Sequence, residues 1–262
     1  MRFRTAACLV LAGLLGATPW PSHAAVGGDL EAAVQTITRK LQQAWASDPG
    51  TASLPFPSIE VLPAGKRALA ACPAGAPVAS ANSSGIYCPG SQKVLLDRSW
   101  LETDFKNYGQ WGIAYWIATA LGQMIGSQQN GTTTLPMPAA NLEANCFGGV
   151  LIGAAEGLQP GREEKLLSPA LKAYGATEAG SMGSRSQRAY ALLTGLGATD
   201  ATCSTNAMAA LALNQVPDPP RLEQIRQLGE DRGSNSLLAV LSSQCRRLAN
   251  ASCPRRIGRM KP

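Results

Sequence analysis

Apolar residues recur at helical spacing near the start of the chain, in a stripe made of Leu30, Ala33, Val34, Ile37, Leu41 and Trp45. This period predicts an amphipathic helix from Asp29 to Ala46, and Asp29 can cap its start. Further on, the short apolar runs "SIEVLPAG" and "KVLLDRSWL" predict strands. The segment between them, "ACPAGAPVASANSSGIYCPG", predicts a loop because Gly, Pro, Ser and Asn dominate it.

The second half of the chain predicts helices. Residues 110–128 are apolar nearly all round and carry no charge, which indicates a central core helix. A second, glycine-rich helix is expected from Asn141 to Leu158. Within "GSMGSRSQRAYALLTGLGA" we expect a loop and then a helix, with Ser184 or Ser186 as the N-cap. Residues 219–228 and 234–249 predict two amphipathic helices, and neither a repeat nor a second core is evident.

The first residues are typical of a signal peptide. Arg2 and Arg4 precede the apolar run "AACLVLAGLLGA", and Ser22 and Ala24 are small residues at the two positions that signal peptidase reads. We predict cleavage after Ala24, with Ala25 as the second choice and an uncleaved membrane anchor as the alternative. After cleavage no transmembrane segment is expected, and we expect the protein to be exported to a periplasm or the extracellular space.

Export changes the available chemistry. The chain has one histidine, His23, which leaves with the signal peptide, so Ser-His pairs, Cys-His pairs and histidine-ligated zinc are excluded. An even set of cysteines then remains, which predicts disulfides on an exported chain. Short loops favour Cys72–Cys88 and Cys245–Cys253 and leave Cys146–Cys203, although spacing alone does not decide the pairing. The six are Cys72, Cys88, Cys146, Cys203, Cys245 and Cys253.

Composition and charge narrow the class of protein. The 262 residues are 45% apolar and 15% charged, which fits one globular domain with a small appendage. The net charge of +6 falls to +4 once Arg2 and Arg4 are removed. A basic tail could bind anionic envelope polymers or stay solvated, and no nucleic acid is expected because no aromatic residues interleave with it. Its residues are Arg246, Arg247, Arg255, Arg256, Arg259 and Lys261.

Four stretches carry a resemblance to a known family, the bacterial neutral zinc metallopeptidases, a zincin-like group. "YCPGSQKVLLDRSWLE" is similar to a family segment of Tyr-Cys-Pro-Gly, a Lys-Val strand, an Asp and a helix. "GIAYWIATALGQMIGSQ" and "NLEANCFGGVLIGAAEG" resemble the helices that bear His-Glu-x-Gly-His and Glu-x-x-Ala-Asp-Cys. "GSRSQRAYALLTGLGATDATCST" resembles the next conserved run, and together they span roughly residues 72–206.

The resemblance implies that the catalytic groups have been replaced. The two histidine positions hold Thr119 and Gln123, and the catalytic glutamate position holds Ala120. The third zinc ligand corresponds to Asn141, and the aspartate one turn later corresponds to Asn145. Neutral side chains are poor zinc ligands and Ala120 has no proton to move, so we expect no metal, no cofactor and no catalytic residue.

The resemblance also implies the architecture: an α+β, mostly helical, disulfide-bridged zincin-like scaffold with a small sheet. We expect a signal peptide over residues 1–24, a degenerate peptidase domain over 25–206 and a helical extension with the basic tail over 207–262. Asn141 is expected to hydrogen-bond with Thr119 or Gln123 across the former cleft. Alternatively, Thr119 and Gln123 are interior polar residues with no binding role.

Three functions remain open from the sequence. The first is an exported, inactive peptidase homologue that binds a ligand, with a peptide or an envelope component as candidates, or that has a structural role. The second is a hydrolase that uses carboxylates such as Asp97, Glu102, Asp104 or Glu143, since a carboxylate pair needs no histidine. The third is an envelope adaptor that works through the basic tail.

Overall fold

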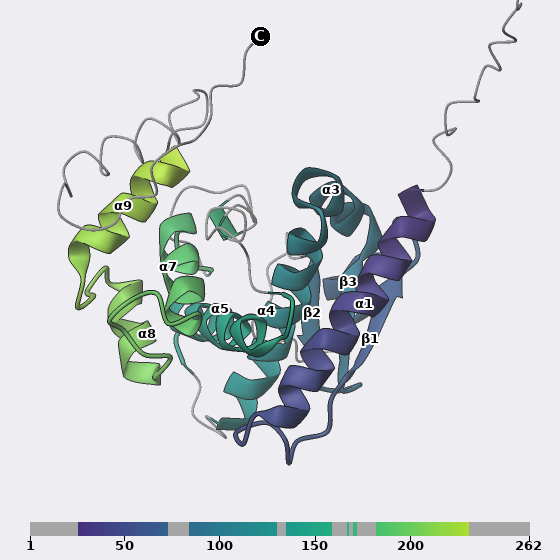
Figure 1. Ribbon diagram of the computed structural model, residues 1–262, viewed down its shortest axis with the longest axis horizontal. Coiled ribbons are helices and arrows are strands. Elements are labelled where there is room, and N and C mark those ends of the chain that lie inside the picture. The colour runs from purple at the N-terminus through teal and green to yellow at the C-terminus, as the bar shows by residue number, and fades with distance from the viewer. Residues whose placement is uncertain are drawn as a thin grey trace, which may run out of the picture.

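A computed structural model describes residues 26–72, 84–129, 135–158, 167, 170–171 and 182–230. The described chain is mostly helical, with one small sheet (Figure 1). The predicted signal peptide, the 234–249 helix, the basic tail and the Cys245–Cys253 pair lie outside the described residues. The helices are α1 (Val26–Ser47), α2 (Ala68–Ala71), α3 (Arg98–Tyr108), α4 (Gln110–Gln129), α5 (Met137–Ala154), α7 (Arg185–Gly195), α8 (Thr205–Ala212) and α9 (Pro219–Glu230).

The sheet has three strands, β1 (Ser58–Leu62), β2 (Gly85–Cys88) and β3 (Lys93–Asp97), in the order β1-β3-β2. The central strand β3 runs parallel to β1, with Ile59 opposite Val94, and antiparallel to β2, with Ile86 opposite Leu95. The sheet and α1 lie on one side of α4, while α7, α8 and α9 lie on the other (Figure 1).

Several local expectations from the sequence were wrong. The run "KVLLDRSWL" is a strand only to Asp97, because the Asp97 carboxylate accepts a hydrogen bond from the Trp100 backbone N–H and starts α3. The expected loop before it contains strand β2, which a four-residue run could not signal without its partner β3. Helix α1 begins at Val26, so Asp29 lies in its first turn instead of capping it. Helix α5 begins at Met137, where Pro136 precedes it.

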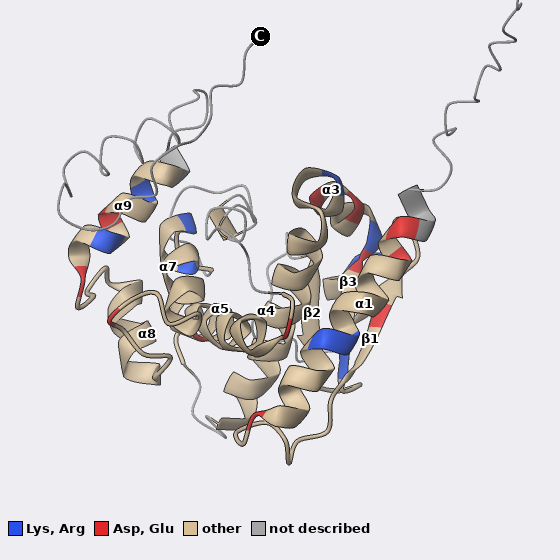
Figure 2. Cartoon of the chain, in the orientation of Figure 1, with Lys and Arg blue, Asp and Glu red and all other residues tan. Residues whose placement is uncertain are grey.

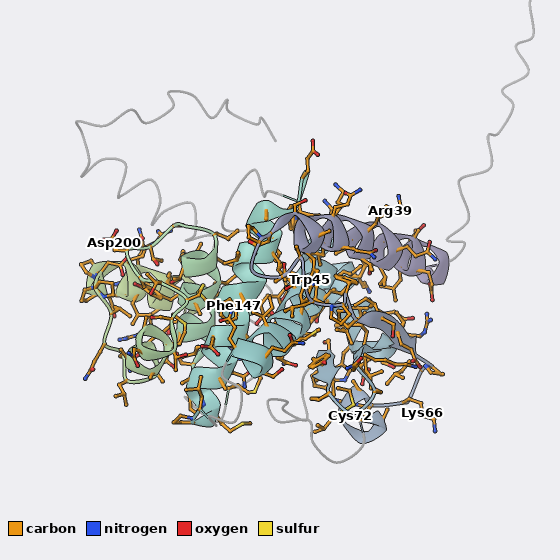
Figure 3. The ribbon with its side chains drawn as sticks, turned by 90° about the horizontal axis from the view of Figure 1, so that it is seen from below. Arg39, Trp45, Lys66, Cys72, Phe147 and Asp200 are labelled. Atoms are coloured by element: carbon orange, nitrogen blue, oxygen red, sulfur yellow. A yellow bond between two sulfur atoms is a disulfide. The ribbon has the colours of Figure 1, made fainter. Side chains whose placement is uncertain are left out.

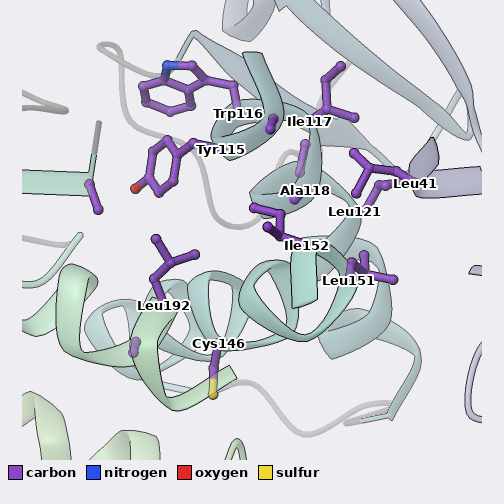
Figure 4. Packing of buried hydrophobic residues seen from close by; sticks show 14 of the residues in the cluster. Leu41, Tyr115, Trp116, Ile117, Ala118, Leu121, Cys146, Leu151, Ile152 and Leu192 are labelled. Atoms are coloured by element: carbon purple, nitrogen blue, oxygen red, sulfur yellow. The ribbon is translucent and has the colours of Figure 1, made fainter. Parts of the chain in front are cut away.

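Helix α4 is the centre of the core, as its apolar sequence predicted. Every residue from Gly112 to Gly126 is buried, and the helix packs against α1, α3, α5 and β2. Figure 2 shows that α4 carries none of the charged side chains that mark α1, α3 and α9. On one side of the cluster Leu41 of α1, Leu121 of α4 and Leu151 of α5 gather (Figure 4). Burial of such side chains is the main favourable term in folding.

Two glycines let the core helices approach to backbone contact. A Cβ atom added at Gly122 of α4 would collide with the carbonyl oxygen of Ala144 in α5. One added at Gly195, at the end of α7, would collide with the carbonyl oxygen of Cys146 in α5. Since any other residue brings that atom, the distance of α5 from α4 and α7 depends on glycine at both places.

Two covalent links and one helix cap agree with the sequence. Cys72 is bonded to Cys88, and Cys146 is bonded to Cys203, with Cα–Cα distances of 5.6 Å and 5.5 Å. The first bond joins the end of α2 to β2, and the second fixes α5 to the segment before α8. Ser184 is the N-cap of α7 and forms a capping box with Gln187, one of the two caps expected there.

We predict that Gly122→Ala destabilises the fold by about 3 kcal/mol, because the new methyl group meets backbone that cannot move aside. Gly153→Ala in α5 is the matched control, since its Cβ would lie 3.5 Å from the Leu196 side chain, an ordinary contact. The free energy of unfolding of this control should rise by about 0.5–1 kcal/mol, because alanine has a higher helix propensity than glycine. Urea denaturation with the disulfides intact measures both, and equal effects would contradict the packing described.

Candidate functional site

The five positions singled out in the sequence come from two adjacent helices. Thr119, Ala120 and Gln123 belong to α4, and Asn141 and Asn145 belong to α5. All five are buried, with exposed fractions between 0% and 7%. The close contact at Gly122 and Ala144 holds the two helices together here, so the positions share one interior region. Their hydrogen bonds, however, run in different directions.

Gln123 ties α4 to the sheet. Its Oε1 accepts a hydrogen bond of 2.8 Å from the backbone N–H of Tyr87 in the edge strand β2. An unpaired backbone donor at a buried strand edge costs free energy, so this contact stabilises the strand. Gly122 faces α5, and the next residue lies about 100° further round the helix. Gln123 therefore faces β2.

Asn145 makes the contact between α4 and α5 that the sequence did not indicate. Its Oδ1 accepts a hydrogen bond of 2.8 Å from the Tyr115 hydroxyl, and its Nδ2 donates to the backbone oxygen of Asn141 at 2.8 Å. Tyr115 precedes Thr119 by one helical turn and so lies on the same helix face. This spacing was the one signal that could have revealed it.

The expected bond from Asn141 to Thr119 or Gln123 is absent from the contacts of the described residues. The Nδ2 of Asn141 lies 2.6 Å from the sulfur of Met182, and Gln123 is turned toward Tyr87. The Thr119 hydroxyl is fully buried and has no hydrogen-bond partner in the described part of the chain. The physical reason is the glycine contact, which brings backbone to backbone at the centre of the helix pair and directs the longer side chains outward from it.

The residues at these positions are not of the kinds that hold zinc in proteins. Their oxygen and amide groups are neutral, whereas zinc in proteins is held by imidazole, thiolate and carboxylate. Among the described residues no group of three or more His, Cys, Asp and Glu side chains could hold a metal ion. The nearest carboxylate in sequence, buried Glu143 of α5, accepts a hydrogen bond of 2.9 Å from Thr205 of α8.

The other three carboxylates also have partners of their own. Asp97 caps α3, and its Oδ2 lies 2.8 Å from Nε of Arg67. Glu102 lies 3.7 Å from Arg98 across one turn of α3. Each of these carboxylates is thus engaged by a neighbouring side chain or backbone group.

The carboxyl group of Asp104 has a shifted pKa. Its Oδ2 accepts hydrogen bonds from Trp116 Nε1 at 2.5 Å and from Ser84 Oγ at 3.2 Å. Burial raises the pKa of Asp104 above its usual 3.8, and the two hydrogen bonds oppose the shift only in part. Burial, and then the negative charge of Asp104, also raise the pKa of Tyr108. This cluster joins α3, α4 and the start of β2.

Comparison with family models, with curated proteins and with solved structures finds no match to this chain. The resemblance to the neutral zinc metallopeptidases therefore stands on the residues of the chain alone. Within the described ranges, no helix has both the length and the apolar character needed to cross a membrane.

We predict that Asp104→Asn removes a pH-dependent loss of stability. Because the folded-state pKa is raised, the native form binds its proton more tightly than the unfolded chain. The contribution to stability is present below pH 3.8 and is lost as the pH rises through the raised pKa. Over that pH interval, the free energy of unfolding of the variant should therefore rise relative to that of the unmodified protein. Urea denaturation at several pH values measures this difference.

Glu31→Gln is the control of opposite sign. A hydrogen bond from Arg98 lowers the pKa of Glu31 below its usual 4.5, so its contribution is lost as the pH falls through the lowered value. At higher pH, the free energy of unfolding of the Glu31 variant should therefore be lower than that of the unmodified protein. The same trend in both variants would contradict the burial described for Asp104.

We also predict that Thr119→Val stabilises the fold by about 1 kcal/mol, because it removes a buried hydroxyl that has no partner and keeps the shape. Thr51→Val is the matched control: Thr51 is also buried, and its hydroxyl donates to the Trp45 backbone oxygen at 2.7 Å. The free energy of unfolding of the Thr51→Val control should fall by about 1 kcal/mol, because the hydrogen bond is lost. Thermal and urea unfolding measure the difference, and destabilisation by both substitutions would show that Thr119 has an unseen partner.

Proposed function

We propose that this chain is an exported, catalytically inactive homologue of the neutral zinc metallopeptidases and acts by binding or as a structural protein. One observation carries the proposal. The five positions that resemble the catalytic set lie in two closely packed helices, α4 and α5, and all five hold neutral side chains. The helix pair persists, whereas the metal ligands and the base do not.

The environment of Gln123 and Ala120 supports the loss of activity. The Gln123 amide is bonded to the backbone of β2, so it serves the edge strand where a peptidase would need a zinc ligand. Ala120 is fully buried and offers no group that could take a proton from water. Restoring one residue would therefore restore no mechanism, because activity in this family requires the ligands and the base together.

The scaffold and the location form part of the same proposal. A mostly helical chain with a three-stranded sheet and two disulfides is compatible with the zincin-like scaffold that the resemblance implies. Disulfides persist in oxidising compartments, which supports a periplasmic or extracellular protein after removal of residues 1–24. The ligand class proposed for the former cleft is a peptide or another component of the cell envelope.

The first test measures metal and activity in the mature, full-length protein. We expect zinc and other transition metals far below one equivalent by mass spectrometry of the purified protein, and no cleavage of casein or a peptide library with added zinc. A tightly held stoichiometric metal, or cleavage that a chelator stops, would overturn the proposal. Cleavage that a chelator leaves unchanged would favour the carboxylate alternative.

The second test rebuilds the site. A variant with Thr119→His, Ala120→Glu, Gln123→His and Asn141→Glu should bind about one zinc ion, because two histidines one turn apart and a glutamate complete a zinc site. The control carries Thr119→Gln, Ala120→Gln and Asn141→Gln, which are similar in bulk and uncharged. If the buried charges prevent folding, the Thr119→His, Gln123→His pair is tested with Co²⁺ by absorption spectroscopy. Folded variants that bind no metal would refute the positional correspondence.

A further inference from the structure

A hollow lies beside α8, and none of the five α4–α5 positions lines it. It has a volume of about 470 Å³ and is bounded by α7, α8 and the loops that precede and follow α8. This volume falls within the range of small-ligand pockets in proteins. Figure 3 labels Asp200, one of the residues that line this hollow, on the opposite side of the molecule from Cys72. Its apolar wall is formed by Ala201, Ala207, Ala210, Leu211 and Val216.

One side of this hollow is acidic. Asp200 lines it directly, together with Tyr190. The Tyr190 hydroxyl donates to Oδ1 of Asp218, and the backbone N–H of Asp200 lies 3.5 Å from Oδ2 of the same carboxylate. The Asp218 carboxylate therefore contacts two lining residues, Tyr190 and Asp200, although Asp218 does not itself line the hollow. Figure 2 shows acidic residues on the loops at both ends of α8.

Neither carboxylate is neutralised by a basic side chain in the described structure. The ion pairs found there join Arg67 to Asp97, Lys93 to Glu60, and arginines 98 and 226 to glutamates of α1, α3 and α9. Asp200 and Asp218 take part in none of them. The negative charge of Asp200 at the hollow, with that of Asp218 behind the lining residues, complements a ligand with a positive head and a hydrocarbon stem.

We propose that this pocket, defined by Tyr190, Asp200, the α8 wall and Val216, binds a lysine or arginine side chain of a partner peptide. The hydrocarbon stem lies along Ala207, Ala210 and Leu211, and the ammonium or guanidinium group reaches Asp200 beside Asp218. Leu213 supports a peptide as the ligand, because it directly follows α8 and is 69% exposed. A large exposed apolar side chain at the end of the helix that lines the pocket offers contact to the residues next to the basic one.

The test titrates the mature full-length protein with short capped peptides that differ in one residue: Ala-Leu-Lys-Ala, its arginine form and its norleucine form. By calorimetry we expect saturable binding of the two basic peptides and at least roughly tenfold weaker binding of the norleucine peptide, because a charge-assisted hydrogen bond is lost. Asp200→Asn should weaken the lysine peptide roughly tenfold for the same reason. Ala210→Leu should abolish binding by filling the hollow.

Glu223→Gln is the matched control, because it removes one carboxylate from exposed α9, outside the pocket lining. It should leave the affinity within about twofold, since screened surface charges act weakly at a distance. Equal binding of the norleucine peptide, or equal effects of Asp200→Asn and Glu223→Gln, would overturn the proposal. So would binding that occurs only after the six basic tail residues are changed to Gln, because the chain's own tail would then be the occupant. Near-UV circular dichroism confirms that each variant is folded.

Discussion

The close approach of α4 and α5 at Gly122 is the constraint on which the rest of the structure depends. Helix axes separated by ordinary side chains leave room for facing side chains to meet between them. Here the Gly122 position touches the Ala144 carbonyl, and Gly195 repeats the arrangement between α5 and α7. Three helices are thereby fixed at backbone distance, and the disulfide from Cys146 to Cys203 adds a covalent link to the same helix.

This packing decides what the polar residues of the helix pair can do. Gly122 occupies the face toward α5, so Gln123 is directed to the edge of β2 and bonds to Tyr87. The contact that crosses between the helices is formed one turn earlier, by Tyr115 and Asn145. The interior between α4, α5 and β2 therefore contains hydrogen bonds that join neighbouring elements and one buried threonine hydroxyl.

The five α4–α5 positions and the hollow beside α8 differ in chemical character. The α4–α5 positions are neutral and buried. The hollow beside α8 is open, apolar along one wall and acidic along another, and it is lined both by residues within the resemblance, such as Asp200, and by residues that follow it. A protein that binds peptides without cutting them could use the second region independently of the first, since the described contacts give each its own hydrogen bonds.

The sequence by itself determined the elements that local patterning specifies. The stripe of Leu30 to Trp45 and the uncharged core helix were predictable, because spacing and residue type act over a few turns. The sequence offered Ser184 as one of two caps, and it favoured two disulfide pairs that are formed without deciding among the possible pairings. Only the tertiary structure decided that Gly85–Cys88 is a strand, that Gln123 faces it, and that Asp218 contacts Asp200 beside the pocket. Each of these features depends on a contact between segments that are distant in the sequence. The spacing of residues along the chain does not specify which distant segments come into contact.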